Sequence, residues 1–244
     1  MALKSINYDQ KTFDISYEIL NPTAKRDIVV LHGWGSNKEI MKGSFSKYMA
    51  DFRHIYIDLP GFGKSSCPIA LTTKDVANIV EDLLIQIDAS KDIVMGHSFG
   101  GKVATLLKPT MLVLLSSAGI VVPKPTSIKI KMAVYKTLKI FGLAKFRSLF
   151  VADDAKALTQ EMYETFKNVV DEDFSDIFLE FDKTALLCWG KDDTATPLSS
   201  AKKIDELIDN SSLIVYEGDH FFFTKNAKDI SKNIEESFLK TLGE

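Results

Sequence analysis

The chain is poor in several residue types whose abundance would define its class. Among 244 residues there are two cysteines, Cys67 and Cys188, which are too few for a disulfide framework, so we expect a reducing compartment. No run reaches the roughly 18 uninterrupted apolar residues of a membrane-spanning helix, and residues 1–10 lack the apolar core of a signal peptide. We therefore expect a cytoplasmic protein without a transmembrane segment.

Residues for several other kinds of chemistry are scarce as well. The formal net charge of −3 argues against a general affinity for nucleic acid. The chain has four histidines, and no group of cysteines and histidines has the spacing of metal ligands. Gly61 and Gly63 form a Gly-x-Gly pair, but the rest of a phosphate-binding fingerprint is missing. The sequence predicts neither a metal nor a cofactor.

Short apolar runs alternate with helical patterns along most of the chain. Runs that favour strands are residues 28–31, 54–58, 93–95, 111–115, 185–189 and 213–216, after two short strands within residues 5–20. Helical patterns occupy residues 45–50, 197–208 and 229–239 and a segment that begins at Thr72 or Thr73. This alternation predicts an α/β fold in which a mostly parallel central sheet carries helices on both faces.

The alternation stops between residues 120 and 182, where no strand is evident. We therefore expect a core of residues 1–119 and 183–244 and an inserted helical cap of residues 120–182. Within it, residues 121–152 hold seven lysines and arginines and no acid, and residues 153–182 hold ten acids and two lysines. The basic stretch would suit an acidic partner, such as an acyl carrier protein or a phospholipid surface. We favour mutual neutralisation of the two stretches, because the basic residues do not gather on one side of a helical wheel.

The most informative segment is Gly-His-Ser-Phe-Gly at residues 96–100. It follows a predicted strand and precedes a run compatible with a helix, and G-x-S-x-G in that setting is typical of a nucleophile elbow. Glycine is needed two residues to either side of the serine, because side chains would collide in so tight a turn. The alternative is a glycine-rich turn with an ordinary surface serine. We interpret Ser98 as a nucleophile beside a helix N-terminus, which favours a developing oxyanion.

A serine nucleophile of this kind needs a histidine base and a carboxylate. The elbow resembles that of α/β-hydrolases, and this resemblance implies that the acid and then the histidine follow the serine in the chain. Of the four histidines, only His220 lies after Ser98, directly past the run at residues 213–216. Parallel sheets assemble their sites at the carboxyl ends of the strands. The acid is expected after the run at residues 185–189, where Asp193 has the better spacing and Asp192 remains an alternative.

Four motifs carry a resemblance to a known family. They are HGWG at residues 32–35, DLPGFGKS at 58–65, GHSFGG at 96–101 and WGKDDTATP at 189–197. The chain resembles α/β-hydrolase-fold serine hydrolases of the capped group that contains carboxylesterases and carbon–carbon bond hydrolases. The resemblance spans nearly the whole chain except the cap and implies an α/β-hydrolase fold. The usual small residue before the last histidine is Asp219 here, which is expected to alter the electrostatics of His220. We read the DLPGFGKS turn as structural.

The proposed oxyanion hole consists of backbone N–H groups. One belongs to Phe99, directly after the nucleophile, and the resemblance implies that the second belongs to Trp34. Gly33 and Gly35 let the loop that carries Trp34 approach closely. Gly33, His97 and Phe221 are expected to line the substrate pocket.

Three functions are compatible with these residues. The first is hydrolysis of a carboxylic ester or thioester of a small or medium acyl substrate through a Ser-His-Asp triad. The second is carbon–carbon bond hydrolysis of vinylogous diketones of the 2-hydroxy-6-oxo-dienoate type by the same triad. Members of that group typically carry an arginine and a tryptophan near the substrate, whereas here three phenylalanines occupy residues 221–223 and Arg147 is the only arginine of the cap. We therefore favour the ester. The third, a non-catalytic binding protein, conflicts with an intact triad.

Overall fold

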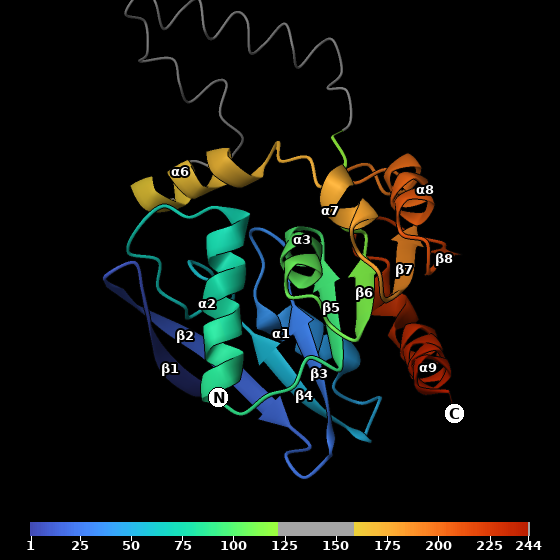
Figure 1. The fold of residues 1–244 in the computed structure, drawn as a ribbon, viewed down its shortest axis with the longest axis horizontal. Coiled ribbons are helices and arrows are strands. Elements are labelled where there is room, and N and C mark those ends of the chain that lie inside the picture. The colour runs from blue at the N-terminus through green and yellow to red at the C-terminus, as the bar shows by residue number, and fades with distance from the viewer. Residues whose placement is uncertain (122–158, 244) are drawn as a thin grey trace, which may run out of the picture.

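A computed structural model of the chain describes residues 1–121 and 159–243. Its centre is an eight-stranded sheet of order β1-β2-β4-β3-β5-β6-β7-β8 (Figure 1). The strands are β1 (Ala2–Tyr8), β2 (Lys11–Leu20), β3 (Arg26–Leu31), β4 (Phe52–Ile57), β5 (Ile93–His97), β6 (Met111–Leu115), β7 (Thr184–Gly190) and β8 (Ser211–Tyr216). From β4 to β8 along this order all neighbours are parallel, and β1 and β2 join one edge in antiparallel orientation. The predicted mostly parallel sheet is confirmed.

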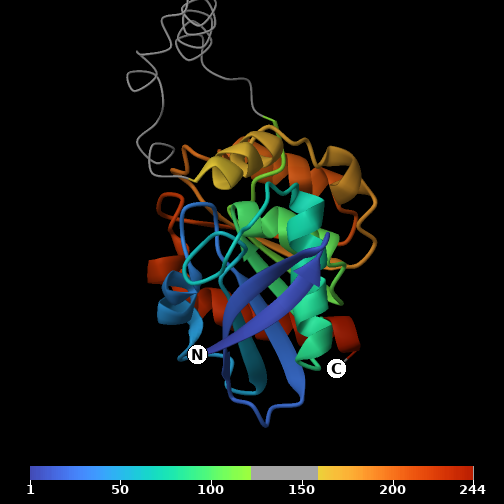
Figure 2. The ribbon, with the colours of Figure 1, turned by 90° about the vertical axis from the view of Figure 1, so that its left-hand side faces the viewer.

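Helices cover both faces of the sheet, as predicted. They are α1 (Lys38–Phe45), α2 (Thr73–Gln86), α3 (Phe99–Leu106), α6 (Gln160–Val169), α7 (Ser175–Leu179), α8 (Leu198–Leu207) and α9 (Phe223–Leu242). Side chains alternate along β3, so that Val29 and Leu31 pack with α2, α3 and α8, while Ile28 and Val30 pack with α1 and α9. Figure 2 shows the sheet between these two helical layers. Both faces of β3 are therefore buried, which explains its continuous apolar sequence.

The structure corrects the bounds of two helices. The prediction of a helix at residues 45–50 is wrong, because α1 ends at Phe45. The helix begins earlier because Asn37 caps it, accepting a hydrogen bond from Glu39 N–H at 3.0 Å. The last helix begins at Phe223 instead of residue 229, because Phe223 and Ala227 continue its buried face. For α2 the cap is Thr72, in a reciprocal capping box with Asp75.

Helices α6 and α7 are the described helices of the predicted cap, and the remainder of the cap, residues 122–158, lies outside the described residues. Both lie at the end of the sheet where α3 begins (Figure 1). Apolar side chains of α6 and α7 and of the residues that flank α7 join the core cluster of α2 and α3: Met162, Val169, Phe174, Phe178 and Phe181. Phe174 N–H also donates to Gly119 O at 2.8 Å. The described residues of this segment therefore pack as part of the core. None of the helices in the described ranges is both long and apolar enough to cross a membrane.

Candidate active site

Ser98 occupies the sharp turn that joins β5 to α3. Its backbone angles are φ 50° and ψ −115°, a region that residues with a side chain rarely adopt. A Cβ on Gly96 would overlap the carbonyl of Gly100, and a Cβ on Gly100 would overlap the carbonyl of His32. Phe99 is the first residue of α3, so its N–H has no acceptor within the helix. The strained turn thus places a half-buried serine beside an available backbone donor.

His220 and Asp193 are joined directly. His220 follows β8 and Asp193 follows β7, and the distance between His220 Nδ1 and Asp193 Oδ2 is 2.7 Å. The Asp193 side chain is fully buried, and the His220 side chain is 18% exposed. Because a carboxylate only accepts, His220 Nδ1 carries the proton of this hydrogen bond, and Nε2 is the nitrogen that carries no proton in the neutral form of the ring. No hydrogen bond links Ser98 Oγ to His220 among the described residues, and His220 reaches β5 through its carbonyl, which lies 3.0 Å from His97 Nε2.

The loop after β7 holds the Asp193 carboxylate in its ionised form. Asp193 Oδ1 accepts hydrogen bonds from Ala195 N–H at 2.8 Å and Thr196 N–H at 2.9 Å. Burial favours the neutral acid, but the hydrogen bonds from His220 and from Thr196 N–H outweigh it and lower the pKa of Asp193 to about 2. The neighbouring Asp192 is exposed, and its N–H donates to Gly218 O at 2.9 Å. Of the two candidate acids, the structure brings only Asp193 to His220.

Thr196 is a polar residue of this site that the sequence analysis missed. Its Oγ1 lies 2.9 Å from Asp193 Oδ2, 3.3 Å from His220 Nδ1 and 3.0 Å from Ser116 O. The hydroxyl therefore lies beside the Asp193–His220 hydrogen bond. The Asp-x-x-Thr spacing was a usable signal, because an aspartate often binds the backbone two or three residues further on. Asp219 is exposed, and its carboxylate accepts a hydrogen bond from Phe221 N–H at 2.9 Å.

Trp34 lies in the loop between β3 and α1, where its ring joins an aromatic cluster. Its ring centroid lies 4.8 Å from that of Phe62, 5.6 Å from that of Phe99 and 5.3 Å from that of Phe166 on α6. Gly35 has φ 71°, a left-handed conformation that favours glycine. The Trp34 ring therefore contacts both the helix that follows Ser98 and helix α6.

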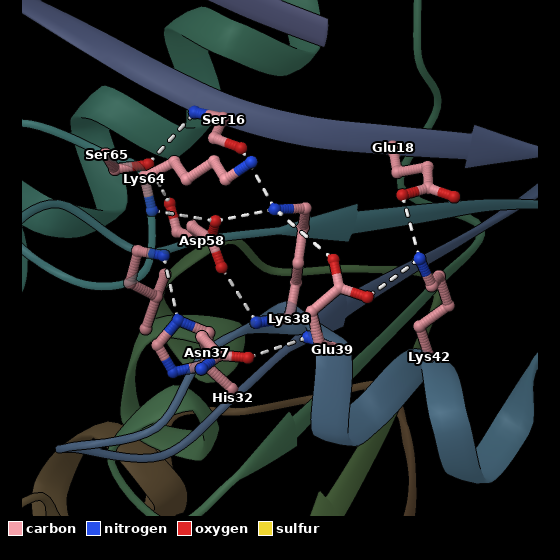
Figure 3. A network of polar contacts seen from close by, with 11 residues as sticks. Ser16, Glu18, His32, Asn37, Lys38, Glu39, Lys42, Asp58, Lys64 and Ser65 are labelled. Atoms are coloured by element: carbon pink, nitrogen blue, oxygen red, sulfur yellow. Dashed lines mark hydrogen bonds and ion pairs between the residues drawn. The ribbon is translucent and has the colours of Figure 1, made fainter. Parts of the chain in front are cut away.

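A buried polar network holds the end of this loop at Lys38 (Figure 3). Asp58, at the end of β4, accepts from Lys38 Nζ at 2.6 Å, from Lys38 N–H at 2.8 Å and from Lys64 N–H at 3.1 Å. Lys38 Nζ also donates to Ser16 Oγ at 3.0 Å. Lys38 and Asp58 are each 1% exposed, so the ion pair is sequestered from water. The Asp58 carboxylate thus binds its own DLPGFGKS turn, through Lys64 N–H, and also binds Lys38, the first residue of α1.

His32 connects this network to the elbow. Its Nδ1 lies 2.8 Å from Gly33 O, and its Nε2 accepts a hydrogen bond from Leu59 N–H at 3.0 Å. Burial lowers the pKa of His32 to about 4, so the ring is neutral and its single proton lies on Nδ1.

The sequence analysis did not single out Lys38, because nothing in the sequence indicates that a lysine is buried unless its partner is known.

The three residues expected in the substrate pocket differ in exposure. Gly33 is buried against the side chains of His97 and Ser98. His97 is 1% exposed, and its ring packs against His220 and Phe221. Phe221 is 42% exposed. Their role in binding a substrate stays a prediction. Across residues 1–121 and 159–243, no group of three or more histidine, cysteine or acidic side chains could hold a metal ion.

Comparison with known proteins gives the family. The model of the alpha/beta hydrolase family matches residues 28–231. The chain belongs to the alpha/beta hydrolase family. It is therefore an enzyme with hydrolase activity, and this hydrolase matches the family across β3 to α9.

Proteins named as hydrolases and proteins named as esterases both match this chain. The 2-hydroxy-6-oxononadienedioate/2-hydroxy-6-oxononatrienedioate hydrolase 1 of Pseudomonas putida is 27% identical over 230 residues, covering 79% of this chain and 80% of that protein. A pimeloyl-acyl-carrier-protein methyl ester esterase of Edwardsiella ictaluri is 38% identical over 81 residues, covering 33% of this chain and 30% of that protein. The solved esterase of Exiguobacterium antarcticum has a TM-score of 0.75 at 20% identity, covering 96% of this chain and 98% of that chain, and shares the fold.

Proposed function

We propose that this hydrolase cleaves a carboxylic ester or thioester of a small or medium acyl group, with Ser98, His220 and Asp193 as its catalytic triad. The observation that carries the proposal is the buried Asp193 carboxylate, which lies 2.7 Å from His220 Nδ1. The two residues lie in the loops after β7 and β8, and the His220 ring packs against His97, the residue before Ser98. This hydrogen bond leaves His220 Nε2 bare and able to accept a proton.

In the proposed mechanism, Ser98 Oγ attacks the carbonyl carbon while His220 Nε2 takes the hydroxyl proton. Asp193 stabilises the resulting imidazolium and stays ionised, because its pKa is lowered to about 2. His220 then protonates the leaving alkoxide or thiolate, which departs and leaves an acyl-enzyme. Water attacks this ester with His220 again as base, releasing the acid and restoring Ser98. Hydrogen bonds between a nucleophile and its base often tighten only when substrate is bound.

The negative charge on the tetrahedral oxygen would be stabilised by two backbone donors. Phe99 N–H is available at the start of α3, and the positive end of the helix dipole points at the same place. The second donor in this proposal is Trp34 N–H. The Asp58 network anchors the same loop at Lys38, which limits its movement during the reaction.

Carbon–carbon bond hydrolysis is the second candidate function. It is favoured by the 27% identity to the Pseudomonas putida hydrolase, which extends over 79% of this chain. The three consecutive phenylalanines at residues 221–223 weigh against it, since that group typically carries a tryptophan near the substrate. The ester therefore remains our first choice.

We further propose that residues 120–182 form a cap that sets substrate choice. The ring contact between Phe166 of α6 and Trp34, at 5.3 Å, brings this segment to the proposed oxyanion loop. An acidic carrier protein would be recognised by the basic stretch at residues 124–147, which lies outside the described residues. The partial match to a pimeloyl-acyl-carrier-protein methyl ester esterase makes an acyl chain on such a carrier one substrate to test.

Labelling with a fluorophosphonate probe tests the nucleophile. We expect the wild type to be labelled and Ser98→Ala to be inert, because the probe reacts with an activated serine. Ser199→Ala, which removes an exposed serine on α8, is the matched control and should label like the wild type. Labelling that persists in Ser98→Ala would refute the assignment.

A substrate panel then separates the two functions. It contains nitrophenyl esters of graded chain length, a thioester, the same acyl group on a carrier protein, and a vinylogous diketone. Turnover of esters with little action on the diketone supports the first proposal. Turnover of the diketone alone reverses the ranking, while a preference for the carrier-bound acyl group that weakens with salt identifies an acidic carrier.

A further inference from the structure

His97 is a buried histidine for which the proposed mechanism has no use. It is the last residue of β5, directly before Ser98, and is 1% exposed. Its ring centroid lies 4.6 Å from that of His220, 4.9 Å from that of Phe223 and 5.3 Å from that of Phe221. The side chain therefore fills the space between the strand that carries Ser98 and the turn that carries His220.

The hydrogen bonds of His97 determine its tautomer. Nε2 lies 3.0 Å from the carbonyl oxygen of His220, which can only accept, so Nε2 carries the proton. Burial, followed by the neighbouring His220, lowers the pKa of His97 to about 3, so the ring holds no second proton near neutral pH. Nδ1 is therefore a bare acceptor, and it is buried without a hydrogen-bond partner among the described residues.

The other edge of the His97 ring lies against the proposed oxyanion loop. A Cβ on Gly33 would lie 2.9 Å from His97 Nδ1 and 3.0 Å from Ser98 Cβ. Glycine at this position thus lets the loop close onto both residues. The His97 ring consequently contacts both the turn that carries His220 and the loop that carries Trp34. His97 also directly precedes Ser98 in the chain.

The turn that carries His220 is held from two sides. On the β7 side, Asp193 binds the His220 ring, and Asp192 N–H binds Gly218 O. On the β5 side, the bond from His97 Nε2–H to His220 O is the hydrogen bond that joins the turn to the nucleophile strand within the described residues. Asp193 binds the His220 ring, whereas His97 binds the main chain of His220 and ties it to the strand that ends at Ser98.

We propose that His97 is a positioning residue that sets the distance between His220 and Ser98, acting through its Nε2–H bond to the His220 carbonyl; this inference rests on the proposed function. His97 also remains neutral when His220 gains a proton, so the imidazolium meets no like charge from the ring beside it. A misplacement of catalytic groups by about 1 Å can reduce a rate about 100-fold.

Two kinds of variant separate the hydrogen bond from packing. His97→Phe keeps an aromatic ring and removes the donor, and we expect kcat per labelled site to fall about 10- to 100-fold with little change in KM. His97→Met is a second donor-free variant, in case the phenylalanine is not accommodated. His97→Gln restores an N–H at similar reach and should recover kcat to within roughly threefold of the wild type. Fluorophosphonate titration counts the competent sites, and thermal unfolding measures stability.

A second readout does not depend on hydrolysis. In a Ser98→Ala background, the NMR titration of the His220 ring should shift with His97→Phe and return with His97→Gln. Two outcomes would overturn the proposal. One is an equal loss of kcat in all three variants that follows a loss of thermal stability, which would show that His97 acts by packing alone. The other is a His97→Phe variant in which kcat and the His220 titration are both unchanged. If the wild type turns over no ester, thioester or diketone, the proposed function fails, while the NMR titration still decides the role of His97.

Discussion

At the scale of the residue, the surroundings of Asp193 distinguish it from its neighbour. Two backbone N–H groups, the Thr196 hydroxyl and the His220 ring surround its carboxylate, whereas Asp192 is exposed to solvent. Hydrogen bonds to the charged form explain why burial does not neutralise Asp193. The carboxylate thus stays available to orient His220 over the whole range in which proteins are usually assayed.

Substitution of the two aspartates tests this difference. Asp193→Asn keeps the shape of the side chain but no longer fixes the tautomer of His220, so kcat should fall by roughly 10³- to 10⁴-fold. Asp192→Asn is the matched control and should change kcat less than about twofold. Ester hydrolysis, with thermal unfolding to verify the fold, measures both. A large loss in Asp192→Asn with an active Asp193→Asn would transfer the role of the acid to Asp192.

At the scale of the element, the Lys38–Asp58 pair joins the start of α1 to the end of β4. Lys38 contributes its ammonium and its backbone N–H to the same carboxylate, while Lys64 N–H binds it from the following turn. A Cβ on Gly63 would overlap this carboxylate, so the turn needs glycine there. Loops that flank the proposed site are therefore fixed by one charge pair in the protein interior.

Removal of the buried ammonium should be costly. Lys38→Met leaves the Asp58 carboxylate buried without a counter-ion, and the free energy of unfolding should fall by about 3–5 kcal/mol. Lys42→Met on the same helix is the control, because Lys42 is partly exposed beside Glu18 and Glu39 and should cost less than about 1 kcal/mol. Urea unfolding measures both variants. Equal losses of unfolding free energy in Lys38→Met and Lys42→Met would show that burial of the ion pair makes no difference.

At the scale of the whole molecule, buried neutral histidines couple stability to pH. Burial lowers the pKa of His32 to about 4 and that of His97 to about 3, and it also lowers the pKa of His54. Below about pH 6.5 the unfolded chain binds more protons at these histidines than the folded chain does. Acidification from pH 6.5 towards 4 therefore favours unfolding.

We expect the free energy of unfolding to fall as the pH is lowered from about 7 to 5, by up to roughly 1.4 kcal/mol per pH unit for each such histidine. Urea unfolding at several pH values measures the slope. His54→Gln, which lies away from the proposed triad, should reduce the slope without affecting ester turnover, because burial lowers the pKa of His54. A free energy that stays constant between pH 7 and 5 would contradict neutral burial of these rings.

Local patterns were sufficient for much of the fold. Continuous apolar runs predicted the six parallel strands from β3 to β8, because a strand covered on both faces needs no polar positions. The helix at residues 45–50 was misplaced, because the pattern of Met41 and Phe45 was not linked to the Asn37 cap. This error and the late start predicted for the last helix concern where an element begins, which depends on hydrogen bonds at its ends as well as on periodicity.

The sequence by itself determined the tight turn at Ser98, because only glycine fits at positions 96 and 100, and it determined the α/β class through its alternating runs. Only the tertiary structure decided that Asp193 binds His220, that Lys38 is buried on Asp58, and that His97 donates to the turn of His220. Steric limits on a turn act between neighbours in the chain. Contacts among residues on different strands and loops depend on the spatial order of the strands in the sheet.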